Sequence, residues 1–159
     1  MLKKNLKSAI SALFGALLVV VLTGCGASGL DAPTRNIKQV TDGVEATSGE
    51  IKAVNVLLVT QGDGSAVLVG TLINSGEVSD SITGITANGI VGEVSAKTMD
   101  TDSPVIFAGD SANSSARFAG LNAKASDRVE LEISFANAAP IKVSALVRAK
   151  AEEFANVGD

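Results

Sequence analysis

Two segments near the C-terminus alternate apolar and polar residues with a period of two. Residues 129–135 (VELEISF) carry an apolar side chain at every other position, with glutamate or serine between them. Residues 141–147 (IKVSALV) repeat the pattern, and the short segment NAAP joins the two. Because successive side chains of a strand point to opposite faces, such alternation predicts half-buried strands. The two segments therefore predict a β-hairpin with one apolar face and one face in water.

Further strands are predicted upstream, separated by turns that contain glycine. Residues 51–60 (IKAVNVLLVT) are rich in β-branched side chains, with Val54, Val56 and Leu58 expected on one side. After the turn QGDG, residues 66–73 are apolar on both faces, as in a central strand covered on both sides. Short strands at about ten-residue spacing predict an all-β, antiparallel β-sandwich of about seven or eight strands. The other candidate strands are residues 81–87, residues 90–96 after the turn Asn88-Gly89, residues 104–108 and residues 114–118.

The N-terminus has the order of features found in an export signal. Three lysines precede residues 9–22 (AISALFGALLVVVL), an apolar run that is short for a membrane span of roughly 20 residues. The run leads into Leu22-Thr23-Gly24-Cys25, which is similar to the lipobox of bacterial lipoproteins. We therefore expect cleavage between Gly24 and Cys25 and lipidation of the Cys25 thiol. The alternatives are an ordinary signal peptide with a chance cysteine, or an uncleaved anchor.

This interpretation divides the chain into four parts. Residues 1–24 are the expected signal peptide, and residues 25–43 are the lipidated cysteine with a small, polar tether. Residues 44–149 are the expected sandwich domain, and residues 150–159 are a tail expected to form one helical turn or to stay loose. Cys25 is the sole cysteine, so its lipidation would leave the exported domain with neither a disulfide nor a free thiol.

Charge and aromatic content argue against a nucleic-acid partner. After residue 24 the chain has 10 Lys and Arg against 17 Asp and Glu, a formal charge of −7. The same part has no Trp or Tyr, whereas nucleic-acid binding uses clustered cations and, for single strands, stacking rings. The chain also has no histidine, and no serine–lysine motif for nucleophilic catalysis is recognisable. We therefore expect no enzymatic activity, no cofactor and no nucleic-acid partner.

Several short motifs follow one another in a fixed order between residues 51 and 147. Asn74-Ser75-Gly76 is followed by DSITGI, then by PVIFAGD, then by FAGLN. The strand VELEISF and the segment IKV complete the series. This order resembles that of PCu(A)C-type periplasmic copper chaperones, a family with a cupredoxin-like β-sandwich. The resemblance implies a cupredoxin- or immunoglobulin-like form of the predicted sandwich, and it matches structural positions more than a site.

The same resemblance marks a departure from that family, which holds Cu(I) with two histidines and two methionines. The second His-x-Met of the family corresponds here to Ser115 and Arg117. The first histidine falls near Glu93 or Val94. Met99, the only methionine after residue 24, is a weak metal candidate, and an arginine cannot ligate copper. The resemblance implies a lipoprotein branch without the copper ligands, similar to lipoproteins of mycobacteria and their relatives.

Two sets of polar residues have competing interpretations. Ser115 and Arg117 either bind a carboxylate or phosphate of a partner or lie outward at a sheet edge. Asp100 and Asp102 have the spacing of a calcium loop, but no further carboxylate follows closely, which favours a polar turn.

These observations favour one function over an alternative. We expect a non-catalytic interaction module, held by its lipid on the extracytoplasmic face of the cell membrane, that docks onto an envelope protein. The alternative is weak or partner-assisted copper handling through Met99 and carboxylates. The missing histidines favour the interaction module.

Overall fold

The computed structural model of the chain describes residues 42–95 and 98–158. The predicted signal peptide, Gly24, Cys25 and most of the predicted tether lie outside these residues. Within them, no helix has the length and apolar character needed to cross a membrane. The regular elements are β1 (Val44–Ser48), β2 (Ile51–Thr60), β3 (Ala66–Asn74), β4 (Asp80–Ala87), β5 (Ile90–Val91), β6 (Glu93–Val94), β7 (Thr98–Met99), β8 (Val105–Ile106), β9 (Ala116–Phe118), β10 (Arg128–Phe135), β11 (Ile141–Arg148) and the 3₁₀ turn η2 (Glu152–Phe154).

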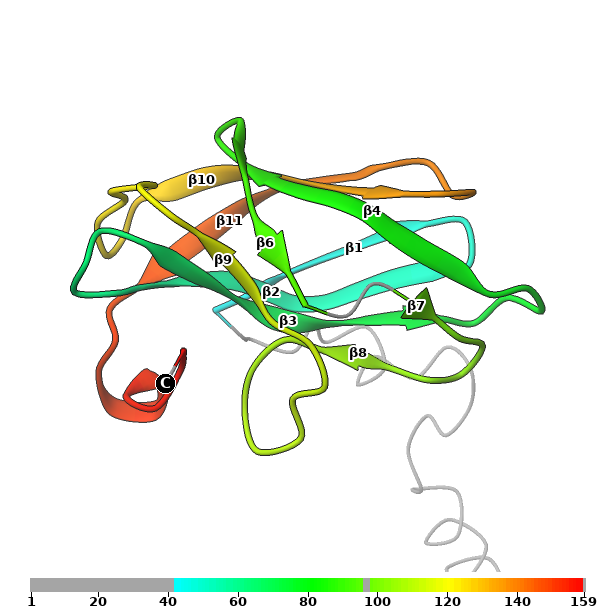
Figure 1. Ribbon diagram of the computed structural model, residues 1–159, viewed down its shortest axis with the longest axis horizontal. Coiled ribbons are helices and arrows are strands. Elements are labelled where there is room, and N and C mark those ends of the chain that lie inside the picture. Colours follow the sequence, from blue (N-terminus) through cyan, green and yellow to red (C-terminus); the bar gives the residue numbers. More distant parts are fainter. Residues whose placement is uncertain (1–41, 96–97, 159) are drawn as a thin grey trace, which may run out of the picture. The chain divides into compact units, whose positions relative to one another are not determined.

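The strands form a sandwich whose single sheet is nearly closed on itself. β4, β10 and β11 make one layer, and β2, β3, β8 and β9 make the other (Figure 1). On one side β11 joins the layers by pairing with β2, and on the other side β5 and β6 lead from β4 to β9. The backbone N–H of Gly92 donates to the Ile85 carbonyl there, at 2.8 Å. The predicted all-β sandwich is confirmed, although residues 42–95 and 98–158 form eleven strands, because several span only two residues.

One strand pair departs from the predicted antiparallel arrangement. β11 and β2 run parallel, with Val147 opposite Leu58 and Arg148 opposite Val59. The other strand ladders of the described residues are antiparallel. A short turn can join only antiparallel neighbours, whereas β2 and β11 are separated by most of the domain. Their direction is therefore set by the fold as a whole.

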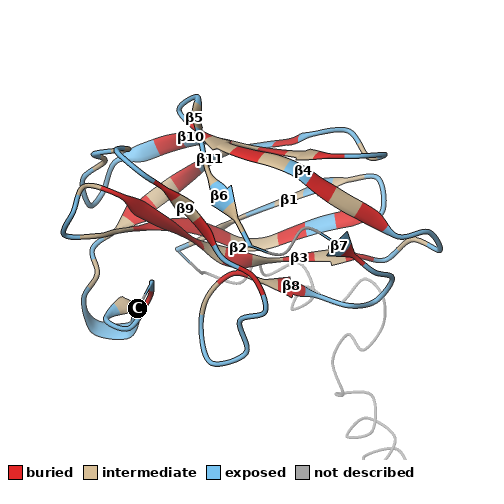
Figure 2. Cartoon of the chain, in the orientation of Figure 1, coloured by how far each residue is buried: buried red, intermediate tan, exposed pale blue. Residues whose placement is uncertain are grey.

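The buried positions lie on both layers of the sandwich (Figure 2). Their side chains form a core that is aliphatic, with a few phenylalanines. All four apolar positions predicted to face inward in residues 129–135 are buried. Phe118 of β9 is fully buried, and its ring lies where a Cβ on Gly92 would approach to 2.6 Å. The strand predicted at residues 90–96 is interrupted at Gly92, because the backbone passes closely over that ring.

A β-bulge in β2 changes which side chains share a face. Asn55 has a φ of 52°, and the register with β3 shifts between Val54 and Leu57. Val56 and Leu58 lie in the main core, whereas Val54 belongs to neither buried cluster. The expectation that Val54 shares a side with Val56 and Leu58 is therefore wrong, because one extra residue reverses the alternation.

A second apolar cluster lies on the outer face of β2 and β3. Leu57, Val59 and Val67 are buried there together with Val157 of the C-terminal tail. The Gln61 side-chain amide donates to the Val157 carbonyl at 3.3 Å. β3 is thus covered on both faces, as its sequence predicts, and the tail with η2 supplies the outer cover.

Candidate functional site

The two segments that the resemblance aligns with copper ligands are neighbours in the structure. β6 and β9 pair antiparallel, with Glu93 opposite Arg117 and Val94 opposite Ala116. Ser115 precedes β9 and is exposed, and its backbone N–H donates to the Ser95 hydroxyl at 2.8 Å. Residues directly opposite in such a pair have Cβ atoms about 4.5–5.5 Å apart. The structure therefore brings Glu93 and Arg117 together, with Ser115 beside them.

Arg117 is engaged by a carboxylate of the turn between β2 and β3. Its Nη2 donates to Asp63 Oδ2 at 2.7 Å, and the two side chains are 40% and 60% exposed. The Asp63 carboxylate also accepts from the Ser65 hydroxyl at 2.7 Å and from the Ser65 N–H at 3.0 Å. The Ser65 hydrogen bonds and the Arg117 guanidinium hold the pKa of Asp63 well below its usual range. Asp63 thus remains a carboxylate and fixes the turn against β9.

Met99 is a core residue in this structure. Its side chain is fully buried within the main cluster. Methionine commonly fills irregular gaps in apolar cores because its chain is flexible and its sulfur polarisable. Within residues 42–95 and 98–158, no group of three or more His, Cys, Asp or Glu side chains is arranged to hold a metal ion. The environment of Met99 therefore gives no support to its candidacy as a metal ligand.

Asp100 and Asp102 lie in a polar turn, as the second interpretation of these residues predicts. The Ser103 N–H donates to the Asp100 carbonyl at 3.2 Å, and Asp102 has a φ of 55°. The Asp100 carboxylate accepts from the Ser79 hydroxyl at 3.3 Å.

Asp80 is a buried polar anchor at the start of β4. It is 9% exposed, and its carboxylate accepts five hydrogen bonds. The donors are the backbone N–H groups of Ser81, Ala136, Asn137 and Ala138 at 2.7–3.1 Å and the Asn137 amide at 3.3 Å. Desolvation alone would raise the pKa of Asp80, but the backbone hydrogen bonds outweigh it and lower that pKa. The charged carboxylate therefore fastens the β10–β11 loop to β4.

Asn74 plays a similar part at the end of β3. It is 3% exposed, and its amide nitrogen donates to the carbonyls of Val78 and Met99 at 2.8 and 3.2 Å. Its oxygen accepts from the Gly76 N–H at 3.0 Å. Asn74 and Asp80 belong to the motifs Asn74-Ser75-Gly76 and DSITGI, on which the family resemblance rests. These motif residues therefore have a structural role in holding loops.

These anchors surround a groove at one end of the sandwich, which we call the loop groove. Its walls come from residues 49–51 where β1 turns into β2, residues 74 and 76–80 where β3 leads into β4, and residues 137–138 between β10 and β11. Its volume is about 430 Å³. Reasoning from the sequence missed the groove because its walls are turns that lie far apart along the chain.

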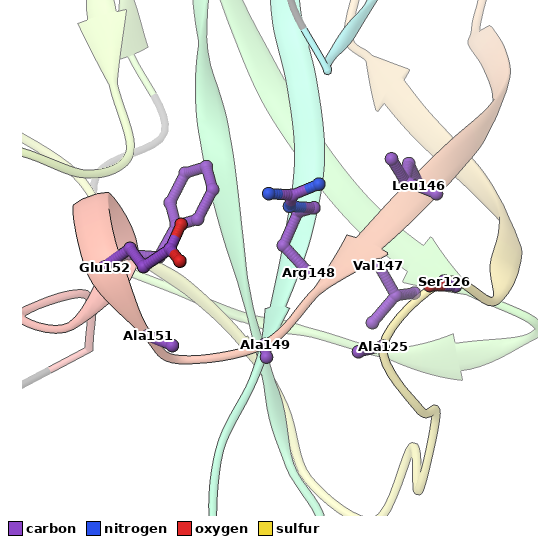
Figure 3. Close-up of a pocket in the computed structure, with 9 residues that line it drawn as sticks. Ala125, Ser126, Leu146, Val147, Arg148, Ala149, Ala151 and Glu152 are labelled. Atoms are coloured by element: carbon purple, nitrogen blue, oxygen red, sulfur yellow. The ribbon is translucent and has the colours of Figure 1, made fainter.

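A smaller hollow of about 230 Å³ lies where the C-terminal tail leaves β11 (Figure 3). Arg148 lines it, and its guanidinium is held from two sides. Arg148 Nη1 lies 3.2 Å from Asp42 Oδ2, and the guanidinium carbon lies 5.9 Å from the centroid of the Phe154 ring. Arg148 thus ties the start of the described domain to its tail.

The fold is the basis for comparing the chain with known proteins. A scan against protein-family models and a search of curated proteins found no match. Comparison with solved structures shows that the chain has the fold of PCuAC-type, copper-chaperone-like domains, as the motif order predicts.

Three solved domains illustrate this likeness. The copper-bound PCuAC domain of PmoF2 superimposes with a TM-score of 0.58 and 20% identity, covering 67% of this chain and 98% of that domain. The apo PCuAC domain of PmoF1 gives 0.57 and 16%, covering 67% and 99%. The apo PCuAC domain of PmoF2 gives 0.58 and 19%, covering 69% and 98%. At these identities the comparison establishes the fold.

Proposed function

We propose that the protein is an extracytoplasmic lipoprotein whose PCuAC-like sandwich is a non-catalytic interaction module. One observation supports the assignment as an interaction module. Arg117, at a position that the resemblance aligns with a copper ligand, is bonded to Asp63 at 2.7 Å. A guanidinium has no lone pair to offer a metal. The domain therefore has the PCuAC-like sandwich, but the position aligned with a copper ligand forms the Arg117–Asp63 ion pair.

The assignment as a lipoprotein rests on the pattern of residues at the N-terminus. Three lysines, a 14-residue apolar run and Leu22-Thr23-Gly24-Cys25 occur in the order that lipoprotein processing requires. A diacylglyceryl thioether on Cys25 inserts two acyl chains, at about 0.8 kcal/mol per buried CH₂, which exceeds the marginal binding of one chain. Confinement at the membrane raises the effective concentration of the domain toward an envelope protein in the same membrane.

Metabolic labelling with an alkyne fatty acid tests the anchor. We expect the parent chain to take up the label and to fractionate with membranes. The Cys25→Ser chain should lose the label, because serine cannot form the thioether. A labelled Cys25→Ser chain, or a parent chain that is unlabelled and released, would overturn the lipoprotein assignment.

Copper handling is the second candidate, favoured by the fold shared with the copper-bound PCuAC domain of PmoF2. The two candidates separate in a Cu(I) titration of the mature lipoprotein in detergent against a competing chelator. The interaction module predicts that the chelator keeps all of the Cu(I). Tight binding of one equivalent would favour copper handling. A Met99→Leu variant would then show whether the buried thioether takes part.

A further inference from the structure

We propose that the loop groove is a docking site for a short segment of a protein partner that carries basic side chains next to apolar ones. This inference deepens the proposed interaction module by naming its binding surface and the chemistry of its partner. It is independent of the position that the resemblance assigns to copper ligands.

The walls of the groove are cross-linked before any partner binds. The Ser75 N–H donates to the Glu50 carbonyl at 3.0 Å, which joins the β3–β4 loop to the β1–β2 turn. The Ser48 hydroxyl donates to the Ala139 carbonyl at 2.7 Å, which joins β1 to the β10–β11 loop. The hydrogen bonds of Asp80 join that loop to β4. A preorganised groove loses little conformational entropy on binding, and this favours affinity.

The lining of the groove is mainly apolar, and one apolar side chain is held out into solvent. Val78 is 75% exposed, although the Asn74 amide fixes its carbonyl at 2.8 Å. The half-buried Ala138 adds apolar surface, and Ile51, which is 2% exposed, lies in the core beneath the groove. An exposed apolar side chain on a fixed loop beside a hollow is suited to contact an apolar side chain of a partner.

The charge of the groove specifies the rest of the partner. Glu50 and Glu77 are exposed at the groove, and the buried carboxylate of Asp80 also lines it. The lining residues, all of them described by the structure, include no lysine or arginine. The two exposed glutamates attract basic side chains and repel anionic lipid headgroups and nucleic acid, and the hydrogen-bonded Asp80 carboxylate adds to the same negative potential. The occupant is therefore a basic and apolar peptide segment.

The groove also lies at the far end of β1 from the point where the chain enters the domain. β1 runs from Val44 to Ser48, and the groove begins at the turn that follows it. In Figure 1 this turn and the loops β3–β4 and β10–β11 lie together at the right-hand end. The groove therefore opens at the opposite end of β1 from Val44, on a face formed by loops of the described domain.

Titration with a blocked peptide, GGLKVKGG, tests the proposal on the isotope-labelled mature lipoprotein in zwitterionic nanodiscs. We expect backbone amide shifts concentrated at Gly49, Gly76, Val78 and Ala138. Binding should weaken as salt rises from 0.02 to 0.5 M, because screening shortens the reach of the carboxylates. Peptides in which glutamate replaces lysine, or serine replaces leucine and valine, should produce much smaller shifts. Shifts that are absent, scattered, or equal with the glutamate peptide would overturn the proposal.

Matched variants separate the groove from general surface effects. Glu50→Gln and Glu77→Gln should each weaken binding about two- to fivefold, as expected for exposed charges. Glu153→Gln, an exposed carboxylate of the tail, should not change it. Val78→Ser should weaken binding, whereas Val91→Ser, at a similarly exposed valine (72%) in β5, should leave it unchanged. The assignment would be contradicted if Glu153→Gln weakened binding as much as the groove glutamate variants, or if Val91→Ser weakened it as much as Val78→Ser.

The outcome is separable from that of the lipoprotein proposal. The Cys25→Ser chain has no site for the lipid but an unaltered groove, so it should give the same peptide shifts. Loss of labelling with retained shifts supports both proposals. A parent chain that takes up the label but shows no peptide shifts rejects the groove proposal and leaves the lipoprotein proposal standing.

Discussion

Glu93 lies directly opposite Arg117 in the β6–β9 ladder, while the Arg117 guanidinium is bonded to a carboxylate from the β2–β3 turn. The ion pair with Asp63 fixes the Arg117 guanidinium over the β2–β3 turn, next to the position opposite Glu93. This arrangement uses the paired strands for structure.

The first prediction concerns that pair of strands. The variant E93H/S115H/R117M introduces two imidazoles and a thioether, donors suited to Cu(I), in β6, in β9 and at the residue just before β9. We expect it to withdraw Cu(I) from a chelator that the parent leaves loaded, measured by the chelator's absorbance. The control is K142H/S144M, which places one imidazole and one thioether on the solvent-exposed face of β11. A folded triple variant with no more affinity than the control would show that these positions do not correspond to copper ligands.

The second prediction is a pH dependence of stability from Asp80. Its pKa is lowered from 3.8 in the folded protein, so the unfolded chain binds a proton more readily. The ionised carboxylate therefore stabilises the fold above about pH 4, and this contribution is lost as the pH falls through the lowered value. Asp80→Asn should be less stable than the parent at neutral pH, by about 1–3 kcal/mol. It should also lose less stability between pH 5 and pH 2.

Urea unfolding at a series of pH values measures this effect. Asp110→Asn, which changes an exposed carboxylate, is the control and should follow the parent. If Asp80→Asn also followed the parent curve, the hydrogen bonds to the β10–β11 loop would not be the source of the acid sensitivity.

The third prediction follows from the burial of Met99. Met99→Leu keeps the volume of the side chain and should change the free energy of unfolding by less than about 1.5 kcal/mol. Met99→Ala should leave a cavity and lower it by about 2–5 kcal/mol. Neither variant should alter the response to Cu(I). A core role would be contradicted if Met99→Ala were as stable as the parent.

The fourth prediction concerns the tail that covers the outer face of β2 and β3. Deleting residues 150–159 removes Val157 from the cluster with Leu57, Val59 and Val67. Burial of one valine is worth about 1.5–3 kcal/mol before the cost of ordering the tail, so we expect a modest loss of stability. The exposed cluster should increase the fluorescence of an apolar dye. Unchanged fluorescence would mean that the tail does not shield the cluster.

The long strands were predictable because their side-chain pattern is local. Residues 129–135 and 141–147 fall within β10 and β11, and residues 51–60 coincide with β2. The turn at Asn88-Gly89 joins β4 to β5 as predicted, since both residues have the positive φ that this turn requires. In each of these cases the local pattern predicts where the strand or turn lies along the chain, although not the bulge within β2.

Features that depend on distant contacts were not predictable in this way. β1 is five residues with mixed polarity, and it becomes a strand by pairing with β2. The bulge at Asn55 is associated with a backbone approach to Gly70 and a hydrogen bond to Gly43, neither of which is visible in the local pattern. The loop groove is a product of three turns that meet only in the folded chain.

The parallel pairing of β11 with β2 has a consequence for how the chain acquires its structure. Val147 must find Leu58 across nearly the whole domain, so the sheet cannot be completed until the last strand has been synthesised. Closing so long a loop costs entropy before any contact repays it, and high contact order slows folding. The β11–β2 ladder is therefore expected to form later than the antiparallel hairpins, whose loops are much shorter.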